Sequence, residues 1–582
     1  MEEEINKNEQ ISTEEVLTDV ELRKKIRKEK ISKIVFDLIA IICIAIFSAV
    51  LAPKSLQNDT FYTVTIGEYI YNNGISDLST DLYSWHELPY TYPHWLYDLG
   101  MFIIYNNFGQ AGIYASTMIL SAILGIAIYA LCFKKSNNRV VSFALTIGAC
   151  YIVKTYVAAR AQLVTFILFT LTVLFIEKFL ETKKKRYALF LIIIPLLIAN
   201  LHCAVFPFYF VLYLPYIAEY LFAVIDDTDW DFKLYSLFLK ICRKIVRKEE
   251  KKEKYNLKLE KLNTAMENRK AKKEKIRQNP YKVKVQKNHA VLILIVIMLI
   301  AATTGCLNPA GNGAYTYLYK TMKGNTTGSI NEHLPLTLVE NREFLVAIAF
   351  FLIVLIFTDS KIKLSDMCML AGITYLAFKS RRQVSMFVLF CIPILANLVS
   401  QFIDKYDKKA FIKIEKFISG WFGAIVITCL FVIWGTKLIK PKLSEDYVNT
   451  NDYPVEASDW MLENLDVKNV KLYNEYNYGS YLLFRGIPVF IDSRCDLYTP
   501  EFNGDYNIET KSYEGRDIFS DALNIAGIGL NYENKFEEYG VTHVISYSNS
   551  KLVMLLENDS NYEEIYKRGN FAIFKRLSAS AE

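Results

Sequence analysis

The sequence predicts an α-helical polytopic membrane protein with about 11 transmembrane helices and a C-terminal extracytoplasmic α/β domain. Three observations support this fold class. Of the 582 residues, 52% are hydrophobic. They occur in blocks of about 15–22 residues, the length that crosses a hydrocarbon core about 30 Å thick. Lysine and arginine gather in particular connections between the blocks, and short strand and helix patterns alternate after the last block.

The apolar blocks must be helical, because the lipid interior offers no hydrogen-bond partners to open backbone groups. Two blocks contain an internal proline, Pro195 and Pro393. We expect membrane spans at residues 34–52, 112–133, 139–156, 161–179, 187–201, 205–225, 289–306, 344–358, 365–378, 383–403 and 419–439.

The basic residues predict the orientation of the chain. Four segments are rich in lysine and arginine: residues 1–33, 133–139, 181–186 and 404–416. Because such segments stay on the cytoplasmic side, the N-terminal arm is predicted to be cytoplasmic and residues 440–582 extracytoplasmic. The bias toward Asn, Lys and Ile fits an AT-rich bacterium. We therefore expect a multi-pass protein of the bacterial plasma membrane.

Within the predicted bundle, residues 34–439, two outer loops are long. Residues 54–110 form the first outer loop, and their tryptophan and tyrosine content favours interfacial helices at 59–72 and 95–107. Residues 307–343 form another outer loop. A loop of this length in a helical bundle is more often functional than idle.

Two further segments complete the predicted organisation. Residues 226–288 form a basic cytoplasmic helical insertion, either a solvated hairpin or a short coiled coil, with a partner site as the alternative. In residues 440–582, strands are expected at "NVKLYN", "IPVFID", "VTHVISYS" and "YEEIYKRGNFAIFKR", with helices between them. Nothing in the charge pattern indicates nucleic-acid binding.

The motifs of soluble enzymes are absent from the sequence: it contains no GxxxxGK[ST], HExxH, GxSxG or CxxC. The chemistry must therefore come from polar residues near the predicted membrane surface. Asp59 follows the first span, with Asp81 and His94 later in the same loop. A partly desolvated carboxylate can accept a proton from a hydroxyl nucleophile or ligate a divalent cation. The alternative is that these are solvated loop residues.

Arginines form a second candidate group. Arg160 lies in "VKTYVAARAQL", and Arg381 and Arg382 lie in "FKSRRQV", both predicted to be outside, where positive charge is disfavoured. The planar guanidinium suits phosphate oxygens. The alternative is snorkelling of the side chain to the interface at a helix end.

Two short polar motifs join these groups. His202 lies in "ANLHCAVFP" and Glu332 lies in "INEHLP". For each motif, the alternative is a polar pair that packs between helices. All of these residues are predicted on one side of the bilayer. Phosphate-binding arginines beside a proton-accepting aspartate suggest that a sugar leaves a lipid phosphate and is captured by a hydroxyl.

The tail carries a third group, in "VFIDSRCDLY". Asp492 ends an expected strand and Arg494 and Asp496 come just after it, where carboxylates face a crevice. They either recognise an acceptor or form an Asp–Arg–Asp network that fixes the loop against the bundle.

An ordered series of segments resembles the GT-C superfamily of polytopic glycosyltransferases, which includes protein O-mannosyltransferases, oligosaccharyltransferase subunits and the lipid A aminoarabinose transferase. The series is most similar to a large bacterial branch of that superfamily. Cys203 and His333 depart from it, where Gly and Trp are expected, and no second acid is evident beside Asp59. The segments are "DTFYTVTIGEYIYNNGISDLSTDLYSW", "PHWLYDL", "ARAQL", "ANLHCAVF", "NPAG", "EHLP", "RRQVSMF", "YNYGSYLLF" and "VFIDSRCDLY".

The resemblance implies a GT-C-like bundle and an inverting transfer from a polyprenyl-phosphate-linked sugar to an extracytoplasmic acceptor hydroxyl. It implies Asp59 as the general base, with the leaving phosphate held by Arg160, Arg381 and Arg382. Glu332 and His94 would orient the sugar or the acceptor. The expected partners are the lipid-linked donor, membrane lipids and a glycan, lipid or protein acceptor. A divalent cation is the one candidate cofactor. The alternative is a non-catalytic lipid-linked glycan carrier or envelope-assembly scaffold.

Overall fold

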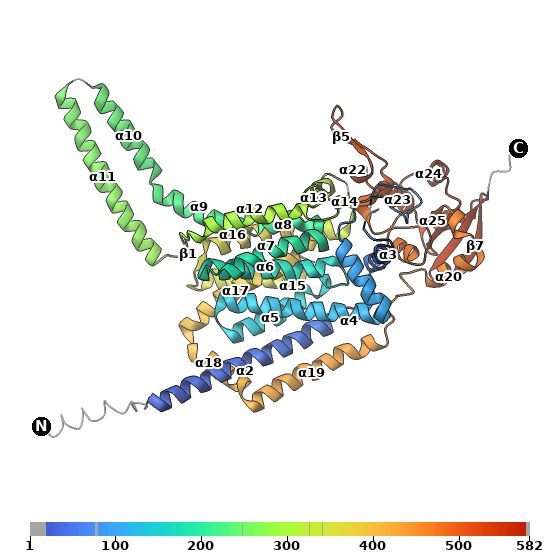
Figure 1. Ribbon diagram of the computed structural model, residues 1–582, viewed down its shortest axis with the longest axis horizontal. Helices are drawn as coiled ribbons and strands as arrows, with labels where there is room; N and C mark the ends of the chain where they lie inside the picture. The colour runs from blue at the N-terminus through green and yellow to red at the C-terminus, as the bar shows by residue number, and fades with distance from the viewer. Residues whose placement is uncertain (1–18, 76–78, 247, 325, 340, 578–582) are drawn as a thin grey trace.

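The computed structural model describes residues 19–75, 79–246, 248–324, 326–339 and 341–577, so most of the expected N-terminal arm lies outside the described residues. Long helices run side by side as a bundle, and the C-terminal strands lie beyond one end of it (Figure 1). A two-helix hairpin projects from the opposite end. We call the end that faces the C-terminal strands the capped end of the bundle.

Each expected apolar segment coincides with a helix or a pair of short helices. Within the described residues, six helical segments are long and apolar enough to cross a membrane by length and composition, and Ala290–Cys306 is a shorter apolar helix. The bundle helices are α2 (Asp19–Leu51), α4 (Trp95–Ser136), α5 (Arg139–Val153), α6 (Ala161–Thr182), α7 (Lys185–Leu201), α8 (Phe206–Val211), α9 (Leu214–Thr228), α12 (Ala290–Thr303), α15 (Arg342–Phe357), α16 (Leu364–Lys379), α17 (Val384–Tyr406) and α19 (Trp421–Leu443).

Helix α4 joins an expected interfacial helix to an expected span. The two parts meet at Gly109, whose φ of 60° and ψ of −155° are not helical. Glycine is the residue that adopts this conformation without a Cβ clash. The short helix α3 (Asn58–Asn73) crosses the first part of α4 closely, because a Cβ on Gly67 would lie 2.1 Å from the carbonyl oxygen of Asp98.

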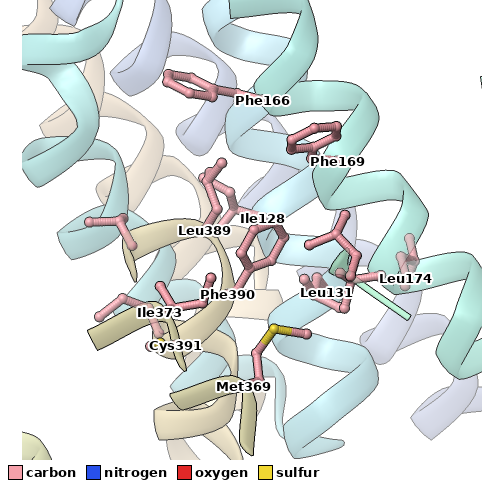
Figure 2. Packing of buried hydrophobic residues seen from close by; sticks show 14 of the residues in the cluster. Ile128, Leu131, Phe166, Phe169, Leu174, Met369, Ile373, Leu389, Phe390 and Cys391 are labelled. Atoms are coloured by element: carbon pink, nitrogen blue, oxygen red, sulfur yellow. The ribbon is translucent and has the colours of Figure 1, made fainter. Parts of the chain in front are cut away.

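The core of the bundle lies where α4, α6, α16 and α17 meet (Figure 2). Its side chains are large and apolar, and they interdigitate between the helices. Examples are Leu131 of α4, Phe166 and Phe169 of α6, Ile373 of α16 and Phe390 of α17, all buried. Three of them, Phe169, Ile373 and Phe390, also border the cavity described below.

The C-terminal residues form a four-stranded sheet in the order β3 (Leu472–Tyr473), β6 (His543–Tyr547), β8 (Phe571–Arg576) and β7 (Tyr562–Arg568). The β3–β6 pair is parallel and the other two pairs are antiparallel. The helices of this region are α20 (Val455–Asn464), α21 (Gly479–Phe484), α22 (Pro500–Asn503), α23 (Ile518–Gly527), α24 (Tyr532–Tyr539) and α25 (Lys551–Leu556).

The expected strand at residues 487–492 does not join this sheet. Its backbone is instead held by the side chain of Asn474, which accepts from the N–H of Phe490 at 2.8 Å and donates to the carbonyl of Ile491 at 2.7 Å. It forms a parallel bridge between Val489 and Ser84, which lies in the segment expected as the first outer loop. The segment thereby joins that loop to the C-terminal region.

The hairpin consists of α10 (Trp230–Ile245) and α11 (Glu249–Gln278) and is visible at the upper left of Figure 1. The remaining helices are α13 (Gly313–Lys323), α14 (Thr326–Ser329) and α18 (Lys408–Ser419). The remaining strands form two small pairs, β1 (Val283–Lys284) with β2 (Ile362–Lys363) and β4 (Asp505–Asn507) with β5 (Ser512–Glu514).

Candidate functional site

A cavity of about 540 Å³ lies at the capped end of the bundle and is bordered by both the helices and the C-terminal region. One part of its wall is polar and includes Asp59, His94, Arg160, His202, Arg382 and Asp496. Another part is apolar and includes Phe169, Phe208, Leu212, Ile373, Met386 and Phe390. The cavity can therefore receive a molecule with a charged group and a hydrocarbon portion.

Asp59 lies in the first turn of α3, where the helix dipole stabilises a negative side chain. Two contacts fix this helix start. The side-chain amide of Asn58 donates to the carbonyl of Tyr476 at 2.8 Å, and the hydroxyl of Thr60 donates to the carbonyl of Ala159 at 3.2 Å. The second contact brings the start of α3 to the start of α6.

Arg160 immediately precedes α6 and pairs with two carboxylates. Its Nη2 forms an ion pair with Asp59 Oδ2, and its Nη1 lies 3.5 Å from Glu332 Oε1. Burial lowers the pKa of Arg160, but the negative charges of Asp59 and Glu332 outweigh burial and raise this pKa above its ordinary value. Arg160 is therefore a permanent cation that joins two segments far apart in the sequence.

Glu332 belongs to the 3₁₀ turn η5 (Asn331–His333), and its side chain is half exposed. The turn is held against the next basic motif, because the hydroxyl of Ser380 donates to the carbonyl of Glu332 at 3.2 Å. The side chain of Arg381 donates from Nε to the carbonyl of Pro335 at 3.3 Å. Arg381 is not among the residues that border the cavity, so its contacts position the η5 loop.

Arg382 lies in the 3₁₀ turn η6 (Arg381–Gln383) and does border the cavity. Its Nη2 donates to Oε1 of Gln162 at 3.0 Å. Lys379, at the end of α16, borders the cavity as well. These cations and Arg160 create a positive wall suited to an anion such as a phosphate.

Two histidines pack edge to face in the same wall. The ring centroids of His94 and His202 lie 5.6 Å apart, and Nδ1 of His94 is 3.5 Å from Asp98 Oδ2. Nδ1 of His202 shares a 2.8 Å hydrogen bond with Thr165. Burial lowers the pKa of His202 well below its usual range, and the nearby His94 and arginines lower it further. His202 is therefore a neutral hydrogen-bonding group at neutral pH.

Asp81, Asp492 and Arg494 form a buried network. Arg494 donates from Nη1 to Asp81 Oδ1 at 2.7 Å, and from Nη2 to Asp492 Oδ2 at 2.6 Å. The hydroxyl of Tyr498 donates to Asp492 at 2.6 Å. Arg494 borders the cavity, whereas the two carboxylates do not. This placement favours the interpretation of the tail motif as a structural network, extended by Asp81.

Asp496 has a different environment from Asp492. It borders the cavity, and its carboxylate accepts from the hydroxyl of Thr321 on α13 at 3.1 Å. Burial raises the pKa of Asp496.

Among the site residues, Gln162 and Asp98 were not predicted from the sequence. A polar residue in the first turn of an apolar block marks Gln162, and a carboxylate four positions after His94 marks Asp98.

The residues at the cavity do not fit a divalent cation. Among the described residues, no group of three or more His, Cys, Asp or Glu side chains is arranged to hold a metal ion. Asp59 and Glu332 are the two carboxylates that approach a common point, and the guanidinium of Arg160 lies between them. A fixed positive charge at that point repels a hard cation, which needs several oxygen ligands.

No protein-family model matches the chain, and no curated protein matches its sequence. Solved structures of similar fold include the oligosaccharyltransferase AglB from Archaeoglobus fulgidus in complex with an inhibitory peptide and a dolichol-phosphate. That likeness has a TM-score of 0.52 and 12% identity, and covers 93% of this chain and 74% of that one. For the apo form of the A. fulgidus enzyme the TM-score is 0.50 at 13% identity, covering 88% of this chain and 69% of the other. The chain therefore shares its fold with these solved structures, as the resemblance noted in the sequence leads us to expect.

Proposed function

We propose that the chain is a membrane glycosyltransferase that transfers a sugar from a polyprenyl-phosphate-linked donor to a hydroxyl of an extracytoplasmic acceptor. The observation that carries this proposal is the cavity itself, in which Asp59 and Arg382 border the same space as an apolar wall between the helices. The similar fold of AglB, which was solved with a dolichol-phosphate, supports a lipid phosphate as the carrier.

The proposed reaction is a single inverting displacement. The acceptor hydroxyl gives its proton to Asp59, whose Oδ2 pairs with Arg160, so that Oδ1 is the oxygen we assign to the proton. The acceptor oxygen bonds to the anomeric carbon while the bond from that carbon to the phosphate oxygen breaks. The electron pair leaves with the lipid phosphate, and Arg382 and Lys379 stabilise its charge.

The remaining residues orient the reactants in this proposal. His94 and the neutral His202 donate or accept hydrogen bonds at the sugar. Glu332 orients the acceptor from the half-exposed η5 turn, which Arg381 positions through Pro335. The Asp81–Arg494–Asp492 network holds the C-terminal region over the cavity.

The proposal includes a topology. The chain crosses the bacterial plasma membrane about 11 times, with a cytoplasmic N-terminus and the C-terminal region outside, as the distribution of basic residues predicts. In this arrangement the cavity opens toward the outer leaflet, where the lipid carrier presents its phosphate and the acceptor arrives from outside.

The test compares cells that lack the chain with cells that carry the wild type, Asp59→Asn or Glu68→Gln. Glu68 is an exposed carboxylate on the same helix, so its replacement is the matched control. Mass spectrometry of lipid-linked sugars and envelope glycans should show donor accumulation and product loss in the Asp59→Asn cells, as in the deletion. Product at the wild-type level in Asp59→Asn cells would exclude Asp59 as the base. Unchanged glycans in the deletion would favour the non-catalytic carrier or scaffold.

A further inference from the structure

Arg160 occupies a point at which two acidic side chains from separate segments meet. Asp59 comes from α3 and Glu332 from the η5 turn, and each pairs with a different nitrogen of the same guanidinium. The Asp59 side chain is 18% exposed and that of Arg160 is 27% exposed, so solvent screens this group only in part.

Two carboxylates that converge in a partly buried site repel each other and require a cation. The cation can be a bound metal ion or a basic side chain. A guanidinium is well suited, because it stays charged and presents five N–H donors in a plane that can serve two carboxylates. In this chain the guanidinium supplies the balancing charge.

Backbone hydrogen bonds at and next to Arg160 fix its position. It is the residue that precedes α6, its N–H donates to the carbonyl of Ala158 at 2.8 Å, and Thr60 binds the neighbouring carbonyl of Ala159. Glu332 is fixed from its other side by Ser380. The two carboxylates and the guanidinium are therefore held in place by three separate parts of the chain.

We propose that Arg160 is the built-in cation of this site, taking the position between Asp59 and Glu332 that a divalent metal ion would otherwise occupy. The chain then binds no divalent cation there, and the guanidinium orients the Asp59 carboxylate toward the acceptor. The role in transfer rests on the proposed function, whereas the cation occupancy is a property of the folded chain alone. Arg160 is a positioning residue, since it acts through Asp59.

The test measures Mn²⁺ binding to the purified full-length chain after treatment with a chelator, using titration calorimetry and the unfolding midpoint with and without Mn²⁺. The wild type should bind no stoichiometric Mn²⁺, and its midpoint should not change. Arg160→Asp replaces the cation with a third carboxylate. It should bind one Mn²⁺ per chain and show a higher unfolding midpoint with Mn²⁺ than without it, because carboxylate ligands strengthen such sites.

Three further variants test whether the gained Mn²⁺ binding depends on the charge at position 160 and on Asp59. Arg160→Lys keeps the charge and should bind no Mn²⁺, whereas adding Asp59→Asn to Arg160→Asp should abolish the gained binding. Arg382→Gln removes a positive charge from the same cavity without adding an acid, so it should not gain a site. Where Arg160→Asp does not fold, Arg160→Asn serves instead, because its amide oxygen joins the two freed carboxylates.

Two results would overturn the proposal. One is stoichiometric Mn²⁺ binding by the wild type that disappears in Asp59→Asn. The other is a folded Arg160→Asp or Arg160→Asn variant that gains no Mn²⁺ binding. If the binding pattern is as expected but the cellular assay detects no transfer, the proposed function fails while the occupancy by Arg160 stands. If transfer occurs, it should persist in the presence of EDTA.

Discussion

The guanidinium of Arg494 and the carboxylate of Asp81 form a 2.7 Å ion pair between residues 413 positions apart, with both side chains almost fully buried. Asp81 belongs to the loop between α3 and α4, and Arg494 to the C-terminal region. The same Arg494 binds Asp492, so one cation balances two acids. This pair fastens the C-terminal region to the loop that follows α3.

Asp81→Asn should therefore destabilise the capped end. Breaking a buried ion pair from one side costs about 3–5 kcal/mol. We expect a lower unfolding midpoint for the detergent-solubilised chain, together with faster proteolysis of the C-terminal region. Asp459→Asn is the matched control, because Asp459 is half exposed and pairs with Arg485 at 2.6 Å, a contact worth about 1 kcal/mol or less. Equal effects of the two variants would contradict the clamp role of Asp81.

Arg382 and Arg381 are neighbours with different placements, which allows a matched comparison. Arg382 borders the cavity and Arg381 does not. Arg382→Gln should raise the KM for the lipid-linked donor about 10–100-fold, the loss expected for one charge-assisted contact. Arg381→Gln should change the donor KM less. Initial-rate measurements at varied donor concentration decide the point, and a larger effect at Arg381 would reverse the assignment.

Gly109 allows α4 to turn from its first part into the bundle. A side chain there meets open space, so the cost of Gly109→Ala arises from the backbone conformation alone, about 1–3 kcal/mol. Gly148 in α5 also faces open space but has no positive φ, and Gly148→Ala should be neutral or stabilising. Unfolding midpoints of the two variants measure the difference. A loss in Gly148→Ala equal to that in Gly109→Ala would show that the cost at Gly109 does not arise from its backbone conformation.

His86 should make the capped end sensitive to acid. Burial lowers the pKa of His86 to about 3, although its Nε2 shares a 2.9 Å hydrogen bond with the carbonyl of Phe490. The unfolded chain, with an ordinary histidine pKa of about 6.5, then binds more protons than the folded chain between these values. The contribution of His86 to the free energy of unfolding is fully present above pH 6.5. It falls as the pH is lowered toward 3, by up to about 1.4 kcal/mol per pH unit.

His86→Gln keeps a donor for Phe490 but cannot titrate. Unfolding midpoints of the wild type and this variant, measured from pH 4 to pH 8, should diverge in their slopes below about pH 6.5. Parallel curves across the whole range would show that His86 contributes no proton linkage.

Helix positions were predictable because they depend on local properties. An apolar block that is long enough to cross lipid must satisfy its own backbone, so each expected span lies on a helix. The two helices expected at 59–72 and 95–107 also correspond to α3 and the first part of α4. The predicted strand at 487–492 was wrong as a member of the sheet. Its backbone hydrogen bonds go instead to the side chain of Asn474 and to Tyr83 and Trp85 in the loop after α3, which no local pattern indicates.

Several residue types that border the cavity were predictable from the sequence, since Asp59, Arg160, His202 and Arg382 each stand out as polar residues beside an apolar block. How these side chains pair was not predictable from the sequence. Arg160 lies between Asp59 and Glu332, and Asp81 faces Arg494, because folding brings together helix ends that no local pattern connects. The type of a charged side chain indicates which kinds of group it can bind. Which residue it pairs with depends on distances that the packing of the whole chain sets.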